Sequence, residues 1–176
     1  MDDHDVTARR PDATDQASPP DPTDPTRNEH PTMTPRQLEL VGADAELVVE
    51  HADAVGRSFY DTLFDLAPGV RPMFPDDLTE QRRKLMDALA ALVRCGLALG
   101  RGGDAEFDRR TAALGSRHRR YGAVPEHYDV VGAALLATLE RHLPTWDDER
   151  AAAWGTLYGA VADAMTAAPD PDAPTS

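Results

Sequence analysis

Two histidines stand nine residues apart in residues 114–132, LGSRHRRYGAVPEHYDVVG. A neutral imidazole is a common metal ligand and a common acid–base group. On the helix that ends at the basic run, an apolar stripe with steps of four, three and four contains Phe107, Thr111, Leu114 and His118. We therefore expect His118 to face the core, where a histidine more often packs through a hydrogen bond than binds a ligand. We expect His127 to lie on the solvated surface.

Two further polar side chains fall on apolar helix faces. Gln81 shares a face with Leu85 and Leu89, and an unpaired amide there would be costly, so we expect a polar partner for it. Tyr60 shares a face with Leu63 and Phe64. From the residues alone, ordinary core packing with one phenol to satisfy is the better interpretation of Tyr60.

The composition narrows the class of protein. The chain has 176 residues, a net charge of −13 and one cysteine. Such a charge repels phosphate backbones, so nucleic acid is not an expected partner. A single cysteine gives no sign of disulfides and suits the cytoplasm. The acidic start is unlike a signal peptide, and the most apolar stretch is short and broken by Arg94, so we expect no membrane span.

The chain is expected to contain one folded domain between two tails. Residues 1–33 are rich in Pro, Asp and Thr and poor in large apolar residues, which predicts a disordered acidic leader. Residues 169–176 predict a disordered tail in the same way. The segment 34–168 is long enough to enclose one core and shows no strand-like alternation.

Helix start signals divide this segment into six or seven helices, so we expect an all-α fold. The expected ranges are 35–50, 52–67, a turn at 69–74, 77–98, 104–119, 125–143 and 146–167. The expected caps and first-turn residues are Thr34 with Gln37, Asp77, Asp104, Pro125, and Thr145 with Asp148. No Cys-x-x-Cys or His-Glu-x-x-His spacing occurs, which argues against a metal site built from protein ligands alone.

Five ordered motifs carry a resemblance to a known family. They are FYDTLFDLAPGVRPMF, QRRKL, LGSRHRRYG, PEHYDVVGAALLATL and AWGTLYGAVADAM. Over residues 36–168 the chain resembles the globin domain of flavohaemoglobins and the related bacterial single-domain haemoglobins. The resemblance implies a globin fold whose helices surround a haem pocket, with haem b as the cofactor.

The resemblance also implies roles for six residues. His118 matches the proximal ligand of the haem iron, and the hydroxyl of Tyr128 would meet its other imidazole nitrogen. On the distal side, Tyr60 and Gln81 match the residues that stabilise bound ligand. The remaining matches are Phe74, which stacks on haem, and Leu85, which lines the pocket.

Two departures from the family matter. A glutamate that completes a relay with the tyrosine and the proximal histidine aligns with Pro169, so the full relay is not expected. No Gly-rich phosphate loop of a flavin or nicotinamide domain is present, and GRGGD near Gly100 is better interpreted as an interhelical loop. An external reductase would therefore have to reduce the haem.

Three functions from different classes follow. The first is reversible binding of dioxygen for storage, delivery or sensing, with nitric oxide and carbon monoxide as further ligands. The second is nitric oxide dioxygenation with a separate reductase. The third is a haem-free interaction module, which the set of His118, Tyr60, Phe74 and Gln81 argues against. A purely structural helical bundle would explain the helices but not the five motifs.

Overall fold

The computed structural model describes residues 33–99 and 104–167. Most of these residues are helical, and none of them lies in a strand. In chain order the elements are α1 (Pro35–Glu50), α2 (Ala52–Leu66), the 3₁₀ helix η1 (Pro68–Met73), α3 (Thr79–Leu99), α4 (Asp104–Arg120), α5 (Pro125–His142) and α6 (Asp148–Ala167). The all-α prediction is confirmed. The predicted disordered leader, up to residue 32, and the predicted tail lie outside the described residues.

Local signals set most of the helix starts. The Thr34 hydroxyl accepts the backbone N–H of Gln37 at 3.2 Å, and the Gln37 side chain accepts that of Thr34 at 2.8 Å, which is the expected capping box. Asp77 accepts the N–H of Thr79 at 2.9 Å. The expected cap at Thr145 is wrong. The cap of α6 is Asp147, which accepts the N–H of Arg150 at 2.8 Å and stands directly before the first helical residue.

The core is centred on α6 and its contacts with α1. Trp154 of α6 is fully buried, and its indole N–H donates to the carboxylate of Asp44 on α1 at 3.0 Å. Arg150 donates to the other oxygen of Asp44 at 3.1 Å. Asp44 is only 3% exposed, so one buried carboxylate joins these two helices through two charge-assisted hydrogen bonds.

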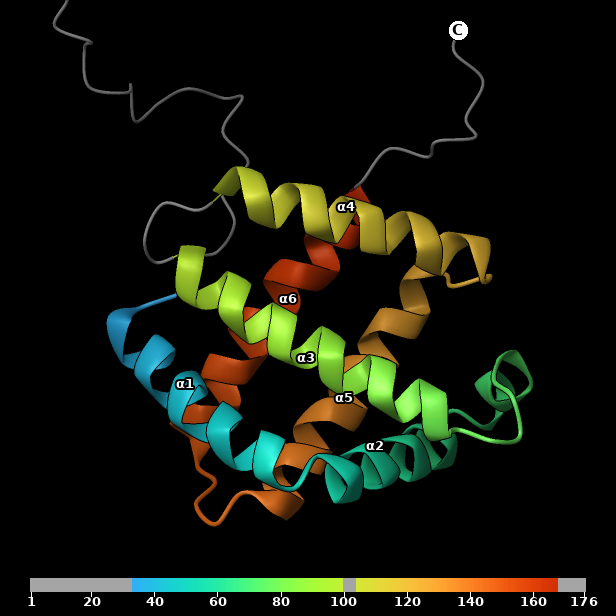
Figure 1. Cartoon of the computed structure of the whole chain (residues 1–176), viewed down its shortest axis with the longest axis horizontal. Helices are drawn as coiled ribbons and strands as arrows, with labels where there is room; N and C mark the ends of the chain where they lie inside the picture. Colours follow the sequence, from blue (N-terminus) through green and yellow to red (C-terminus); the bar gives the residue numbers. More distant parts are fainter. Residues whose placement is uncertain (1–32, 100–103, 168–176) are drawn as a thin grey trace, which may run out of the picture.

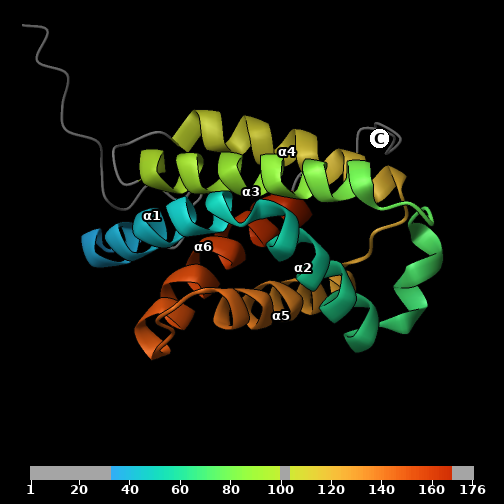
Figure 2. The same ribbon diagram turned by 60° about the horizontal axis from the view of Figure 1, so that its bottom comes forward.

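The arrangement of α3 and α4 prepares a site. The two helices lie side by side and run in opposite directions, and α6 passes behind them (Figures 1 and 2). The start of α3, which carries Gln81 and Leu85, therefore lies at the same end of the molecule as the end of α4, which carries His118. The segment η1, which leads to Phe74, lies at this end too (Figure 1).

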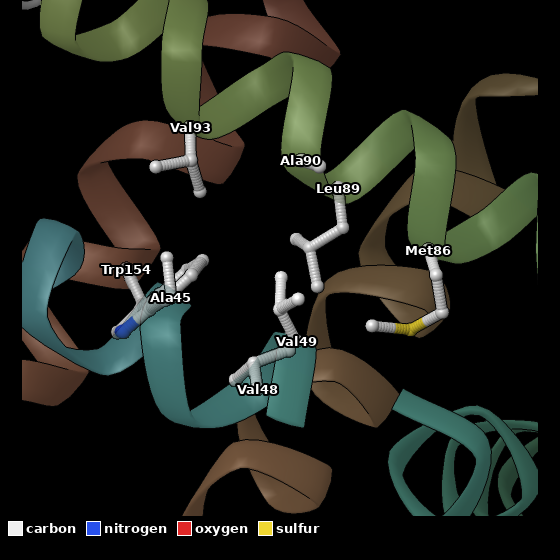
Figure 3. Close-up of a pocket in the computed structure, with 8 residues that line it drawn as sticks. All are labelled: Ala45, Val48, Val49, Met86, Leu89, Ala90, Val93 and Trp154. Carbon is white, nitrogen blue, oxygen red and sulfur yellow. The ribbon is translucent and has the colours of Figure 1, made fainter. Parts of the chain in front are cut away.

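A small apolar pocket lies elsewhere, where α1, α3 and α6 meet (Figure 3). Its volume is about 10 Å³, and its lining consists of Ala45, Val48, Val49, Met86, Leu89, Ala90, Val93 and Trp154. The nitrogen of Trp154 is bonded to Asp44, so no polar group is left to orient a ligand there. The space is a packing gap of about the size of one water molecule. Among the described helices, none is both long and apolar enough to cross a membrane.

Candidate functional site

The first wall of the candidate site is built around the phenol of Tyr60 on α2. Tyr60 is 4% exposed, and its hydroxyl donates to the main-chain carbonyl of Gln81 on α3 at 3.4 Å. Burial raises the pKa of Tyr60 to about 12, and the neighbouring Gln81 and the charge of Arg82 offset part of the rise. The phenol therefore stays protonated at neutral pH and is a hydrogen-bond donor in an apolar surrounding.

A glycine allows this contact between α2 and α3. A Cβ atom at Gly56 would lie 3.3 Å from Cβ of Arg82, which is tighter than most carbon–carbon contacts. Gly56 stands one turn before Tyr60, and Arg82 directly follows Gln81. The close crossing of the two helices at Gly56 is what brings the phenol within reach of the Gln81 carbonyl.

Aromatic rings continue this wall towards η1. The ring of Tyr60 lies 5.6 Å from that of Phe74 and 5.9 Å from that of Phe64, and Phe64 and Phe74 are 5.5 Å apart. Arg71 fixes the corner, since its guanidinium stacks over Phe64 at 5.0 Å and donates to the carbonyl of Phe74 at 3.0 Å. Phe74 is half-buried.

The side chains of Gln81 and Leu85 are half-buried on the first turns of α3. Tyr60 is the polar residue beside Gln81, but its hydroxyl binds the main-chain carbonyl and not the side-chain amide for which a partner was expected. Leu85 packs against the main core cluster, which contains Tyr60 and Leu63. The structure thus brings together four of the residues singled out in the sequence: Tyr60, Phe74, Gln81 and Leu85.

The prediction that His118 is buried is wrong. Phe107 and Thr111 are buried and Leu114 is half-buried, but His118 is exposed. The cause is the place where α6 crosses α4. A Cβ atom at Gly115 would overlap the carbonyl oxygen of Met165 on α6, and Arg119 donates to the same oxygen at 3.0 Å, so the face of α4 that packs against α6 carries Gly115 and Arg119 rather than His118.

The imidazole of His118 is nevertheless oriented. Its Nδ1 lies 2.9 Å from the carbonyl oxygen of Leu114, one turn earlier on α4. A carbonyl can only accept, so Nδ1 is the donor of this bond, and in the neutral form of the ring the lone pair is then on Nε2. The ring of Tyr128 lies 6.3 Å away, tilted by 35°. The partner of Nδ1 is therefore the helix carbonyl rather than the expected Tyr128 hydroxyl, because helical geometry places that carbonyl beside every residue four positions later.

The residues behind Tyr128 were missed by the sequence analysis. The hydroxyl of Tyr158 on α6 donates to the main-chain carbonyl of Tyr128 at 2.6 Å. The Tyr158 ring packs on Gly132, where a Cβ atom would come within 2.7 Å of it. Burial raises the pKa of Tyr158 well above the ordinary tyrosine range. The available signal was an aromatic residue in AWGTLYG, but its partner is a backbone atom that no sequence pattern marks.

His127 has a structural role. Its Nδ1 accepts the backbone N–H of Val124 at 3.3 Å, which satisfies a free donor at the start of α5. We expected His127 to be fully solvated, but the side chain is half-buried. The Nδ1 lone pair of His127 is used by the N–H of Val124, whereas the Nε2 atom of His118 makes no bond to its own helix and is available for a ligand.

Replacing Gly115 with alanine should lower the free energy of unfolding by about 1–3 kcal/mol, because the added methyl group meets the backbone of α6 and α4 has to shift. Urea denaturation followed by circular dichroism measures the effect. Gly159→Ala is the matched control, since a Cβ atom at Gly159 meets nothing within 4 Å and alanine favours the helix. Equal midpoints for the two variants would show that the crossing at Gly115 is not tight.

The chemistry of these donors fits a haem group. A neutral imidazole with a free Nε2 is a usual axial ligand of haem iron. A protonated phenol and an amide on the other wall suit a polar diatomic ligand, and Phe74 and Leu85 suit the faces of a porphyrin. The described residues contain no group of three or more His, Cys, Asp or Glu side chains that would hold a bare metal ion.

Comparison with known proteins finds relatives that match most of this chain. An anaerobic nitrite reductase of Gossypium hirsutum is 27% identical over 144 residues, which cover 76% of this chain and 88% of that protein. A flavohaemoprotein of Bordetella pertussis is 30% identical over 134 residues, which cover 76% of this chain and 33% of that protein. The chain therefore spans about a third of the length of the flavohaemoproteins it matches.

Solved structures show the same fold. The haemoglobin of the shortfin mako, Isurus oxyrinchus, superimposes with a TM-score of 0.64 at 18% identity, over 77% of this chain and 97% of that one. A bacterial globin from Campylobacter jejuni gives 0.56 at 23% identity, over 74% and 91%. The family model described as Globin matches residues 57–165. The chain belongs to the globin family.

Proposed function

We propose that this protein holds haem b between the start of α3 and the end of α4 and binds dioxygen reversibly, for storage, delivery or sensing. Ferrous haem supplies the site at which the gas binds. The observation that carries the proposal is the pairing of two oriented groups: His118, whose Nδ1 is tied to Leu114, and the buried phenol of Tyr60 beside Gln81. Its likeness to globins supports it.

Each residue has a defined task in this proposal. His118 would bind the iron through Nε2. The Leu114 carbonyl raises the basicity of the ring by accepting a hydrogen bond from Nδ1–H. Tyr60 donates a hydrogen bond to the bound gas. At 3.4 Å the hydrogen bond from Tyr60 to the Gln81 carbonyl is long, so a better acceptor can replace that carbonyl as the partner of the hydroxyl. Gln81 supports the phenol, while Phe74 and Leu85 exclude water. Tyr128 packs beside the imidazole at 6.3 Å.

An absorption spectrum tests the proposal. The purified full-length chain is titrated with haem and reduced, with and without carbon monoxide. A Soret band that saturates at one haem per chain and shifts with carbon monoxide is the expected result. A band that never saturates would reject the haem-binding function and leave the haem-free interaction module.

Replacing Tyr60 with phenylalanine should speed the release of dioxygen from the reduced protein by about tenfold or more, since a hydrogen bond to a partly charged acceptor contributes about 1.5–3 kcal/mol. Stopped-flow spectroscopy measures the rate. Tyr121→Phe is the control, because Tyr121 is 78% exposed and its hydroxyl is not the one that contacts Gln81. An unchanged rate in Tyr60→Phe would remove Tyr60 from the ligand site.

Nitric oxide dioxygenation is the second candidate, because the chain is similar to the globin part of flavohaemoproteins and carries a tyrosine and a glutamine on one wall. It needs an external flavin reductase, for which the cytoplasm, our proposed compartment, is suitable. Steady consumption of nitric oxide through many turnovers with added reductase would favour the enzyme. A single stoichiometric turnover would favour the carrier. The glutamate position of the family relay, Pro169, lies outside the described residues.

A further inference from the structure

A basic patch lies at the end of α4, directly around the proposed iron ligand. The last turn of α4 carries Arg117, His118, Arg119 and Arg120, in a chain whose net charge is −13. Arg117 and Arg120 are exposed. Arg119 is instead turned towards α6, where it donates to the carbonyl of Met165 at 3.0 Å.

The two exposed arginines differ from most others in the protein. A carboxylate lies within 4 Å of Arg36, Arg57, Arg71, Arg83 and Arg150. Over residues 33–99 and 104–167, none lies that close to Arg117 or Arg120. Arg117 donates only to the carbonyl of Ala113 on its own helix. Favourable interaction with the helix dipole explains one basic residue here, but it does not explain two exposed cations that have no carboxylate nearby in the described part of the chain.

Exposed apolar side chains adjoin this patch. Tyr121 is 78% exposed, Val124 44% and Met73 42%, and these are three of the five large exposed hydrophobic residues over the described part of the chain. Met73, from η1, reaches this corner because its terminal carbon lies 3.8 Å from where a Cβ atom of Gly122 would be. Gly122 has a φ of +82°, which turns the chain sharply after Tyr121.

We propose that this corner, formed by Met73, Arg117, Arg120, Tyr121 and Val124, is the docking surface for an acidic flavoprotein that reduces the haem. The inference rests on the proposed function. An apolar centre with a charged rim is typical of protein interfaces, and a small one suits a transient electron-transfer complex. In the complex, one electron passes from the reduced flavin to ferric iron, which becomes ferrous while the flavin is oxidised by one electron.

The charge distribution selects this kind of partner. An acidic protein is repelled by the net negative charge of this chain and attracted where basic residues cluster in the last turn of α4, so it is oriented towards the His118 side. A nucleic acid extends over many charges at once and meets the negative remainder of the chain, which disfavours it. The partner is therefore a compact acidic protein rather than a long polyanion.

The test uses the haem-loaded full chain and a flavodoxin as a defined acidic flavoprotein. Binding is measured by titration calorimetry and reduction by stopped flow, each at low and high salt. Arg117→Glu/Arg120→Glu is compared with the control Arg36→Glu/Arg141→Glu, which makes the same change in net charge elsewhere. Reduced lumiflavin, a small donor without a protein surface, reports at high salt whether the haem itself has changed.

In the patch variant we expect flavodoxin affinity and reduction rate at low salt to fall by about tenfold or more, with the wild-type rate falling as salt rises. The control variant should lose much less, and lumiflavin should reduce all three proteins equally. Equal loss in both variants would overturn the proposal. A dimer of this chain that the patch variant dissociates, or binding to anionic lipid vesicles in place of flavodoxin, would overturn it too. An unchanged Soret band in the variant keeps these results separate from the haem-binding proposal.

Discussion

Replacing His118 with glycine is expected to weaken haem binding by more than about 100-fold, and added imidazole is expected to restore it. Loss of a group that merely supports a metal ligand already costs about 10–100-fold, so loss of the ligand itself costs more. Free imidazole rescues the variant because the rest of the site remains in place. Haem transfer to an acceptor protein, followed by absorption, measures retention with and without imidazole.

The control for this experiment is His127→Gly. His127 caps α5 through its contact with Val124, so the variant loses stability but keeps its haem. The two variants therefore separate a structural histidine from a ligand. The assignment of His118 as the ligand would be contradicted if His118→Gly retained haem without imidazole. It would also be contradicted if added imidazole did not restore haem retention.

The second large effect concerns Asp44. Asp44→Ala should lower the free energy of unfolding by about 3–5 kcal/mol, because it leaves the buried indole N–H of Trp154 and the charge of Arg150 without their acceptor. Asp44→Asn should cost less, since the amide oxygen still accepts from Trp154. Urea denaturation of the full chain followed by circular dichroism gives the values.

Glu46→Ala is the matched control for Asp44→Ala. It removes the same charge from the same helix, but Glu46 is exposed, and such surface changes usually stay within about 0.5 kcal/mol. If the two alanine variants were equally stable, the carboxylate of Asp44 would contribute nothing beyond its charge.

The helices could be predicted closely because their signals are local. The capping box at Thr34 involves residues three positions apart, and Pro125 occupies the first position of α5 as expected. The error at Thr145 is also local. Two good capping residues stand within three positions, and the choice of Asp147 depends on its second contact, with the side chain of Arg150 at 3.2 Å.

The site was less predictable, because the periodicity of a helix does not show which face a neighbouring helix covers near its end. The stripe through Phe107 and Thr111 is buried as expected, yet in the last turns of α4 the face against α6 carries Gly115 and Arg119 rather than His118. The acceptor for Nδ1, the Leu114 carbonyl, belongs to the main chain, so no residue type marks it. The sequence predicted a polar partner for the Gln81 amide, whereas Tyr60 donates to the main-chain carbonyl of Gln81, which no residue type marks.

The bond between His118 and Leu114 also has a consequence for the order of assembly. It spans a single helical turn and forms whenever that turn forms, which takes about 0.1–1 μs. The contact between Tyr60 and Gln81 joins residues 21 positions apart and waits for two helices to dock. The two walls therefore assemble at different rates, and the bond that orients His118, the proposed iron ligand, forms before the contact between Tyr60 and Gln81, the proposed gas site.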